Sequence, residues 1–226
     1  MTPQELLRTH PFFSALEEQE VRRLLKHSRS KRVAAGRVIF RREGPGDGLY
    51  GVLSGRVAFT VDSAEGKELI LNILGRGEFF GEIALLDGKG RTAAAVARDD
   101  CELLIIDRNE FLSFVTPRPE MMLHIIDMLC ARLRRATDYI ENSTFLGFTA
   151  RLAKQLLDLL KDHPEGEKAT TLHISQGELA SMLGVSREYV SRQLAAWSEA
   201  GIIDQGRGRL VVRKRHLLER IVGAAA

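Results

Sequence analysis

Hydrophobic residues in the stretch 1–30 recur at spacings that place them on one face of a helix. They are Leu6, Leu7, Phe12, Phe13, Leu16, Val21, Leu24 and Leu25. Pro11 interrupts this pattern and predicts a break between two short helices. Ser14 is followed three residues later by Glu17, so it is a candidate cap for the second helix.

Between residues 33 and 107 the pattern changes to short apolar runs separated by turn residues. The runs cover residues 38–40, 49–53, 57–61, 69–74, 93–97 and 103–106. The turns contain glycine, proline or aspartate, as in the stretch 44–48. Many short strands at this spacing predict an all-β barrel or sandwich. The mouth between the strands of such a fold is a usual place for a small-molecule site.

Residues 119–145 predict one long helix whose apolar positions alternate at spacings of four and three. These positions are Met122, Ile126, Leu129, Leu133, Ala136 and Ile140. The spacing is that of the a/d seam of a coiled coil. The helix either packs on the barrel of its own chain or pairs with a second copy. The seam has polar flanks, which favour an exposed coiled coil and predict a homodimer; they are Asp127, Arg132, Arg134, Arg135, Asp138 and Glu141.

The polar residues 141–144 and Gly147 predict a hinge after the long helix. Residues 148–161 resume as an amphipathic helix, residues 161–168 predict a loop, and residues 171–174 predict a short strand.

Residues 175–194 have the pattern of a helix–turn–helix. Ser175, with Glu178 three residues on, predicts a capping box at the first helix. Gly184 permits a left-handed turn between the helices, and Ser186 is a candidate cap for the second helix. The shared core is expected from Leu179, Ala180, Leu183, Val185, Val190 and Leu194, with Tyr189, Ser191 and Arg192 near the surface.

The second helix carries Arg187, Glu188 and Arg192 in its first two turns. A helix that lies in the DNA major groove presents its N-terminal end to the base edges, where arginine pairs with guanine and glutamate accepts from cytosine. Two arginines paired with Glu188 on a solvated helix would be the simpler interpretation. The capped turn before this helix counts against it.

The stretch after the second helix predicts a two-stranded wing over residues 201–213 with a glycine-rich tip. Basic residues dominate the end of this wing and the segment after it: Arg207, Arg209, Arg213, Lys214, Arg215 and Arg220, against Glu219. A local excess of this kind fits contact with phosphates.

Composition adds only broad limits. The chain has 226 residues, of which 44% are hydrophobic and 28% charged, with a formal net charge of +3. These values predict a soluble globular protein of one or two domains. No stretch has the pattern of a signal peptide or a membrane-spanning helix, which predicts a cytoplasmic protein without a membrane partner.

Two cysteines, Cys101 and Cys130, lack a pairing motif and predict buried or partly buried thiols in a reducing compartment. The six histidines are scattered and are expected to be structural or on the surface. We therefore expect no bound metal. We also find no pairing of a nucleophile with a base and no P-loop of the kind that nucleoside triphosphatases use to bind phosphates, so we expect a protein that is not an enzyme.

The stretch 76–96 predicts a pocket for a sugar and a phosphate. Gly81 lacks a Cβ atom and lets the backbone approach a ligand, and residues 83–86 can form a helical turn whose first N–H groups face an anion. Glu82 can accept hydrogen bonds from a ribose hydroxyl, and Arg91 offers a planar fork to phosphate oxygens. The simpler alternative is a turn between strands with a Glu–Arg surface pair.

The string from Phe80 to Leu86, followed by Arg91, Thr92 and Ala93, resembles the phosphate-binding cassette of cyclic-nucleotide-binding domains. The resemblance implies that Glu82 holds the ribose 2′-hydroxyl and that Arg91 holds the cyclic phosphate. The backbone from Gly81 through Ile83 to Ala84 would complete the phosphate site.

The order of cassette, long helix and winged helix–turn–helix resembles the bacterial cyclic-AMP receptor protein family over nearly the whole chain. The resemblance implies an α+β fold with an N-terminal jelly-roll β-barrel that binds cyclic nucleotides (residues 1–118), a dimerisation helix with a hinge (119–145) and a C-terminal winged helix–turn–helix (146–226). It also implies an allosteric transcription regulator that binds a DNA palindrome with TGTGA-like half-sites and contacts RNA polymerase. The residues expected at the DNA are Ser175, Gln176, Ser186, Arg187, Glu188, Ser191, Arg192 and Arg207.

The purine is less determined than the sugar and the phosphate. In the cyclic-AMP receptor the long helix presents two adjacent hydroxyl residues to adenine, whereas the matching positions here are Ala136 and Thr137. Thr137 keeps one hydroxyl that could reach the base in its own or the partner subunit. Thr92 could bond a guanine amino group, as in relatives that respond to cyclic GMP. The expected ligand is therefore cyclic AMP or cyclic GMP.

Two other functions fit parts of the pattern. One is a regulator of the same fold that binds DNA independently of a nucleotide. The other is a nucleotide-binding regulatory subunit that acts on a protein partner.

Overall fold

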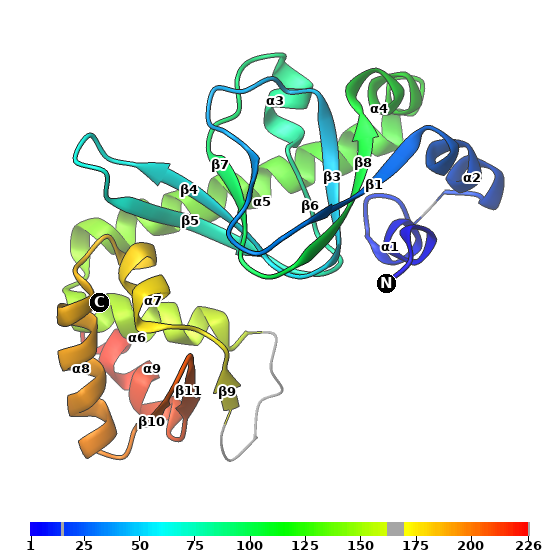
Figure 1. Ribbon diagram of the computed structural model, residues 1–226. Helices are drawn as coiled ribbons and strands as arrows, with labels where there is room; N and C mark the ends of the chain where they lie inside the picture. Colours follow the sequence, from blue (N-terminus) through cyan, green and yellow to red (C-terminus); the bar gives the residue numbers. More distant parts are fainter. Residues whose placement is uncertain (15, 162–169, 226) are drawn as a thin grey trace. The chain divides into compact units, whose positions relative to one another are not determined.

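The computed structural model describes residues 1–14, 16–161 and 170–225. The chain divides into two compact units, and each is described by itself. Unit 1 contains residues 1–63 and 71–131, and unit 2 contains residues 64–70 and 132–226. Figure 1 shows the strands of the N-terminal part and the helices that follow them.

Two short helices begin the chain, α1 (Pro3–Thr9) and α2 (Glu18–Lys26). The cap of α2 differs from the prediction, because Glu17 and Glu20 form its capping box. The hydroxyl of Ser14 instead donates to the carbonyl of Pro11 at 3.0 Å. A carboxylate directly before the helix is closer to the orphan N–H groups than Ser14 is, and it satisfies them.

Two antiparallel sheets form the core of unit 1. One sheet has the strand order β1-β8-β3-β6 and the other β2-β7-β4-β5. The strands are β1 (Ser28–Val33), β2 (Val38–Phe40), β3 (Gly48–Ser54), β4 (Val57–Asp62), β5 (Glu68–Leu74), β6 (Phe79–Phe80), β7 (Ala94–Ala97) and β8 (Cys101–Asp107). The predicted jelly-roll arrangement is confirmed, as two separately hydrogen-bonded sheets rather than one closed barrel. All six predicted strands are present, whereas β1 and β6 were not predicted.

The strands bury their apolar residues in two clusters. One contains Leu49, Leu104 and Phe111 and reaches the N-terminal helices, and the other contains Val52, Phe80 and Leu103. Residues of β3 occur in both clusters because successive side chains of a strand point to opposite faces of its sheet.

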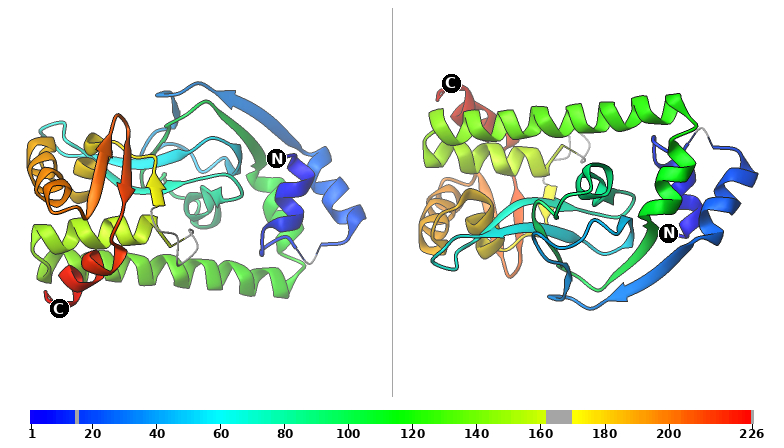
Figure 2. Two further views of the ribbon diagram at one scale, coloured as in Figure 1. Left: turned by 90° about the horizontal axis from the view of Figure 1, so that it is seen from below. Right: turned by 90° about the horizontal axis from the view of Figure 1, so that it is seen from above.

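Three helices complete the first part of the chain: α3 (Glu82–Asp87), α4 (Arg108–Val115) and α5 (Pro119–Phe145). Helix α5 has the predicted bounds, and Figure 2 shows it as one unbroken helix. Met121 and Ile125 of α5 are buried in the core of unit 1. Most of the predicted seam is exposed, with Met122 at 43%, Ile126 at 52%, Leu133 at 68% and Ile140 at 64%.

Within its described residues, the second unit contains a three-stranded antiparallel sheet and four helices after α5. Its elements are α6 (Phe148–Leu159), β9 (Thr170–Leu172), α7 (Gln176–Leu183), α8 (Arg187–Glu199), β10 (Ile203–Gly206), β11 (Arg209–Val212) and α9 (Arg215–Gly223). The sheet order is β10-β11-β9. The predicted helix–turn–helix and wing are therefore present. The predicted loop at 161–168 lies, apart from its first residue, outside the described residues.

The two cysteines differ in environment. Cys101 is buried and Cys130 is exposed, so the prediction that both are at least partly buried is wrong for Cys130. This residue directly follows Leu129 on α5, but its own side chain is exposed. Among the described residues, no helix is long and apolar enough to cross a membrane. The same residues contain no group of three or more histidine, cysteine, aspartate or glutamate side chains suited to a metal ion.

Candidate functional site

The predicted cassette folds as a strand, a glycine turn and a short helix. β6 ends at Phe80, and Gly81 then takes a left-handed conformation with φ of 89° as the N-cap of α3. A Cβ atom at Gly81 would lie 2.6 Å from Nη1 of Arg91, so only glycine fits this position. The left-handed conformation and the close approach of Arg91 both require glycine at position 81.

Arg91 is a buried charged side chain of the cassette, with 2% of its surface exposed. Its Nε donates to the carbonyl of Pro45 at 3.0 Å, and its Nη1 donates to the carbonyl of Gly81 at 2.7 Å. Its Nη2 donates to Oδ1 of Asp47 at 2.7 Å and to the carbonyl of Gly48 at 3.1 Å. The guanidinium therefore joins the cassette to the loop before β3.

Two aromatic rings cover the guanidinium. The Cζ atom of Arg91 lies 4.3 Å from the ring centroid of Phe40 and 5.4 Å from that of Tyr50. Both distances allow a cation–π attraction. Burial, and then the nearby Asp47 carboxylate, raises the pKa of the Tyr50 hydroxyl, so this residue stays neutral beside the arginine.

The loop before β3 also contacts the cassette through its backbone. The N–H of Arg91 donates to the carbonyl of Gly44 at 3.0 Å, and the N–H of Glu43 donates to the carbonyl of Arg91 at 2.9 Å. A Cβ atom at Gly46 would lie 2.3 Å from the carbonyl oxygen of Ala84 in α3, so the two backbones touch at a residue that must be glycine.

The other predicted cassette residues differ in exposure. Glu82 begins α3 and is 1% exposed, Ala84 is 2% exposed, and Ile83 is half-buried. Thr92 is exposed, next to Arg91. The structure thus brings Gly81 and Arg91 into direct contact and buries Glu82 in the same segment.

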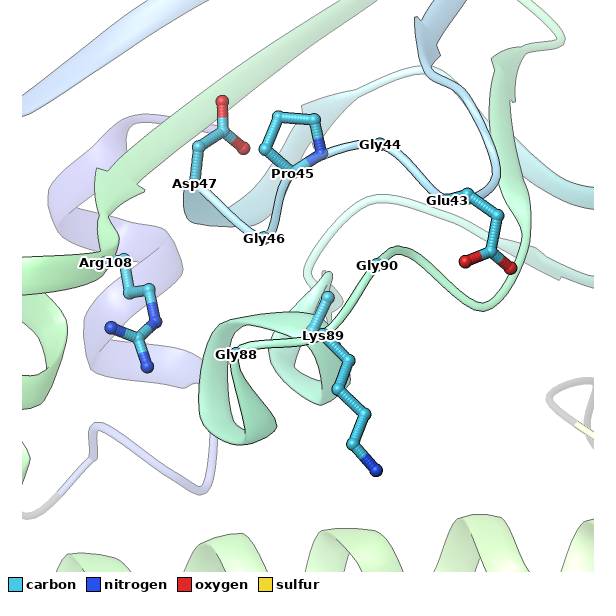
Figure 3. Close-up of a pocket in the computed structure, with 10 residues that line it drawn as sticks. Glu43, Gly44, Pro45, Gly46, Asp47, Gly88, Lys89, Gly90 and Arg108 are labelled. Atoms are coloured by element: carbon cyan, nitrogen blue, oxygen red, sulfur yellow. The ribbon is translucent and has the colours of Figure 1, made fainter.

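A cavity of about 540 Å³ lies between the loop at 43–47, α3 and the stretch 88–90. Figure 3 shows Arg108 and Glu43 at opposite ends of the lining and Lys89 between them, with its side chain extending away from the loop at 43–47. Ala84 is the one residue of the predicted ligand set that lines it. Arg108 also donates from Nε to the carbonyl of Leu85 at 2.7 Å, so a second arginine holds α3 from this cavity.

The partners of Arg91 were not identified from the sequence. Pro45, Asp47 and Gly48 precede it by 46, 44 and 43 residues. A glycine-rich run predicts a turn but does not indicate which distant side chain the turn encloses, so no local signal could have found them.

Thr137, predicted to contact the base, is exposed on α5 and belongs to unit 2, whereas the cassette belongs to unit 1. Its hydroxyl donates to the carbonyl of Leu133 at 3.1 Å within the same helix.

The helix–turn–helix has the predicted caps. The hydroxyl of Ser175 accepts from the N–H of Glu178 at 3.1 Å, and the carboxylate of Glu178 accepts from the N–H of Ser175 at 2.9 Å. Gly184 has a left-handed φ of 66° at the turn, and the hydroxyl of Ser186 caps α8 by accepting from the N–H of Tyr189. Hydrogen bonds between residues close in sequence thus define the N-termini of both α7 and α8.

The N-terminal end of α8 presents charged side chains to solvent. Arg187, Glu188 and Arg192 are exposed, and Ser191 is half-buried. A hydrogen bond from its own backbone N–H, followed by one from Ser186, lowers the pKa of Glu188, so this carboxylate is ionised at neutral pH. The described salt bridges do not pair Glu188 with either arginine.

Residues distant in sequence meet at this end of α8. A cavity of about 460 Å³ is lined by Ser175 and Gln176 from the start of α7, Arg187 from α8 and Arg207 from the wing. The side-chain amide of Gln176 donates to Oε1 of Gln205 in β10 at 2.8 Å, which ties the start of α7 to the wing. The fold therefore gathers four of the predicted DNA-binding residues around one opening.

The basic residues of the wing have different partners. Arg213 forms an ion pair with Asp204 at 2.6 Å, and Arg215 forms one with Glu219 at 3.1 Å. Arg207 lies at the tip next to Gly208, whose φ is 69°. The wing thus presents Arg207 on an exposed turn, while Arg213 helps to hold its two strands together.

Comparison with known proteins identifies both parts of the chain. Residues 30–117 match the family described as cyclic nucleotide-binding domain, and residues 150–221 match the Crp-like helix-turn-helix domain. The chain is 36% identical over 211 residues to the cyclic AMP receptor protein of Thermus thermophilus, which spans 93% of this chain and 96% of that protein. The chain belongs to the cyclic AMP receptor protein family of transcription regulators.

Two further relatives of this family differ in what their names say they respond to. A cAMP-activated global transcriptional regulator of Mycobacterium tuberculosis is 30% identical over 220 residues, covering 96% of this chain and 98% of that protein. The structure of the c-di-GMP-responsive global regulator CLP of Xanthomonas campestris is similar with a TM-score of 0.75 at 29% identity, covering 87% of this chain and 99% of that one. The family resemblance expected from the sequence is thereby confirmed.

Proposed function

We propose that this chain is a DNA-binding transcription regulator that a cyclic mononucleotide switches on, and that it works as a homodimer. The observation that carries the proposal is the placement of Arg91 against Gly81 in a matched cyclic nucleotide-binding domain, on the same chain as a Crp-like helix–turn–helix. Because the nucleotide-binding domain and the DNA-binding domain lie on one chain, no separate protein is needed to couple nucleotide binding to DNA binding.

The ligand roles follow the predicted cassette. Arg91 binds the cyclic phosphate, Glu82 accepts from the ribose 2′-hydroxyl, and the backbone of Gly81, Ile83 and Ala84 completes the site. Thr92 and Thr137 supply hydroxyls near the base. Cyclic AMP is the first candidate because relatives at 36% and 30% identity carry that nucleotide in their names. Cyclic GMP is the second, because Ala136 replaces one hydroxyl and Thr92 is exposed beside Arg91.

Ligand binding changes the partners of Arg91. A guanidinium has five N–H donors, and four hydrogen bonds already connect it to Pro45, Gly81, Asp47 and Gly48. These four bonds leave one N–H, on Nη1, for a phosphate oxygen, so a second bond from Arg91 to the phosphate must share a donor or replace one acceptor. Asp47 is the acceptor most open to replacement, because its side chain is 51% exposed and water can solvate the carboxylate once it leaves.

The DNA roles divide into base reading and phosphate contact. Arg187, Glu188 and Arg192 lie at the exposed end of α8 and read a half-site resembling TGTGA. The residues that contact the DNA around them are Ser175, Gln176, Ser186, Ser191 and Arg207. Four of this combined set line one cavity, which supports a single continuous DNA-facing surface.

The homodimer rests on the exposed seam of α5. Side chains as apolar as Ile126, Leu133 and Ile140 are more than half exposed in the single chain, and their a/d spacing suits a parallel two-stranded coiled coil. Pairing there places two copies of α8 on one DNA duplex, with half-sites one helical turn apart. In this proposal residues 1–118 bind the nucleotide, residues 119–145 form the dimer interface and the hinge, and residues 146–226 bind DNA. The DNA-bound dimer then contacts RNA polymerase.

Fluorescence anisotropy of a labelled TGTGA-type palindrome tests this proposal at one fixed salt concentration, since salt sets DNA affinity. The protein is titrated without ligand, with cyclic AMP and with cyclic GMP, and a scrambled duplex of the same length serves as the control. Tight binding that needs one nucleotide and the palindrome is expected. Equal binding with and without both nucleotides would instead make the chain a nucleotide-independent regulator, and no preference for the palindrome would favour a regulatory subunit that acts on a protein.

A further inference from the structure

Two aromatic rings join the start of α6 to the DNA-facing helix α8. The rings of Phe148 and Tyr189 are stacked, with their centroids 4.0 Å apart and an interplanar angle of 19°. Phe148 is the first residue of α6 and directly follows Gly147, which separates α6 from α5. Tyr189 lies in the first turn of α8 and remains 43% exposed. The stack therefore lies at the surface, outside the core of the helix–turn–helix.

A polar contact lies beside this stack. The hydroxyl of Thr149 donates to Oε1 of Gln193 at 2.9 Å. Tyr189 and Gln193 are four residues apart and so share one face of α8, whereas Phe148 and Thr149 are neighbours in α6. Two contacts between the same short segments restrict both the tilt and the rotation of α8 relative to the residue that follows the hinge.

The same tyrosine also contacts a residue of the DNA-reading set. The guanidinium carbon of Arg192 lies 5.5 Å over the ring of Tyr189, within the range of a cation–π interaction. Arg192 is exposed, and without this contact its long side chain would be free to adopt many orientations. An aromatic face beside it reduces the number of orientations that the guanidinium samples before it meets a base.

We propose that Tyr189 is a positioning residue that orients Arg192 for base reading, and that Phe148 couples this orientation to the hinge at Gly147. The inference rests on the proposed DNA-reading function and adds a route by which a movement at the end of α5 reaches one base-reading side chain. Gly147 suits this role because it separates α5 from α6 and a Cβ atom there would meet nothing within 4 Å.

The competing explanation is that the stack only helps the helix–turn–helix to fold. The two explanations predict different effects on discrimination between DNA sequences. A folding contact affects binding to every DNA sequence equally, whereas a positioning contact affects discrimination at the base pair that Arg192 reads. The ratio of affinities for the TGTGA-type site and for a site changed at that base pair separates them.

The test uses the full chain and measures this ratio by anisotropy for Phe148→Leu, Tyr189→Leu and the double variant. The base pair is first assigned as the one at which Arg192→Ala loses discrimination. Each single change is expected to lower the ratio by roughly threefold to tenfold. The double variant should lose no more than the stronger single one, because the two rings act through one contact. Tyr189→Phe keeps the ring and should restore the wild-type ratio.

A uniform loss of affinity for both sites, with an unchanged ratio, would overturn the inference. So would a full effect of Tyr189→Leu in a chain that already carries Arg192→Ala. Thermal unfolding of each variant shows whether it is folded, and if Tyr189→Leu unfolds, Phe148→Leu gives the same comparison from α6.

A second readout does not depend on DNA. The side-chain Nε–Hε NMR signal of Arg192, assigned with Arg192→Lys, should shift in Phe148→Leu because the tyrosine ring moves relative to it. An unmoved signal would refute the coupling even if DNA recognition proceeds as proposed. A wild-type chain that does not prefer the palindrome, together with a shifted signal, would leave the coupling intact and count against the proposed function alone.

Discussion

Nη2 of Arg91 lies 2.7 Å from Oδ1 of Asp47, and the two side chains differ in exposure, at 2% for the arginine and 51% for the aspartate. The ion pair thus extends from the interior of the cassette to the solvent. In the proposed mechanism a ligand phosphate competes with this carboxylate for the guanidinium of Arg91.

Replacing Asp47 with Asn should destabilise the first unit by about 1–3 kcal/mol, because a buried guanidinium loses its charged acceptor. Urea unfolding followed by circular dichroism measures the change. Asp99→Asn is the matched control, since its partner Arg56 is 37% exposed and water can replace the carboxylate. A loss for Asp47→Asn no larger than that of the control would contradict this account of the pair.

Replacing Leu133 with Glu should separate the proposed dimer. Leu133 is 68% exposed in the single chain, so the variant should fold, but pairing would bury its charge in the seam. The dimer dissociation constant should rise by about 100-fold or more, as measured by analytical ultracentrifugation. Ala131→Glu places the same charge about 200° around α5 and should remain dimeric. Equal self-association of both variants would show that the seam is not the interface.

The elements that the sequence predicted correctly are those specified by local chemistry. Ser175 with Glu178, Gly184 and Ser186 define the helix–turn–helix within a few residues of themselves. β1 was missed because residues 29–32 are polar and exposed, and Val33 is its single buried residue. It is a strand because it pairs with the apolar β8, and that partner lies some seventy residues away (Val33 opposite Cys101, for example).

In the cassette, too, some features follow from the local sequence and others depend on residues that are distant in sequence. Gly81, Glu82 and Arg91 could be named from a local string, and their burial agrees with a built site. The position of the Asp47 carboxylate could not be predicted, because the folding of two sheets brings it to Arg91. The stack of Phe148 on Tyr189 was missed for the same reason, since it joins two helices across the second unit.

Stability should fall with decreasing pH because of His10. Burial lowers the pKa of His10 below its ordinary value of 6.5, and its Nδ1 accepts from the N–H of Phe12 at 3.2 Å. Below pH 6.5 the unfolded chain binds a proton that the folded chain does not, so the contribution is fully present above 6.5 and is lost as the pH falls. His10→Asn should flatten the dependence of the unfolding free energy on pH, as measured by urea unfolding at a series of pH values. An unchanged slope in His10→Asn would contradict this.

Two arginines at one cavity should affect DNA binding differently. Arg187→Ala should cost about 1–3 kcal/mol and relax discrimination at one base pair, because it removes a base contact. Arg207→Ala should weaken binding to all sequences and reduce the salt slope by about 1 per subunit, because it removes a phosphate contact. Anisotropy titrations over a series of salt concentrations measure both effects. Loss of sequence discrimination in Arg207→Ala, with a normal salt slope, would reverse the two roles.

The most direct test of the central claim is the change in DNA affinity that the nucleotide produces, measured for the wild-type chain and for Arg91→Lys. Lysine keeps the charge but loses the planar fork. Arg108→Lys is the matched control, since Arg108 also donates to a carbonyl of α3, at 2.7 Å, but lies outside the proposed phosphate site. The account predicts that the nucleotide tightens DNA binding by about 5–150-fold in the wild type and in Arg108→Lys, and has almost no effect in Arg91→Lys. A nucleotide response in Arg91→Lys equal to that of the wild type would contradict it.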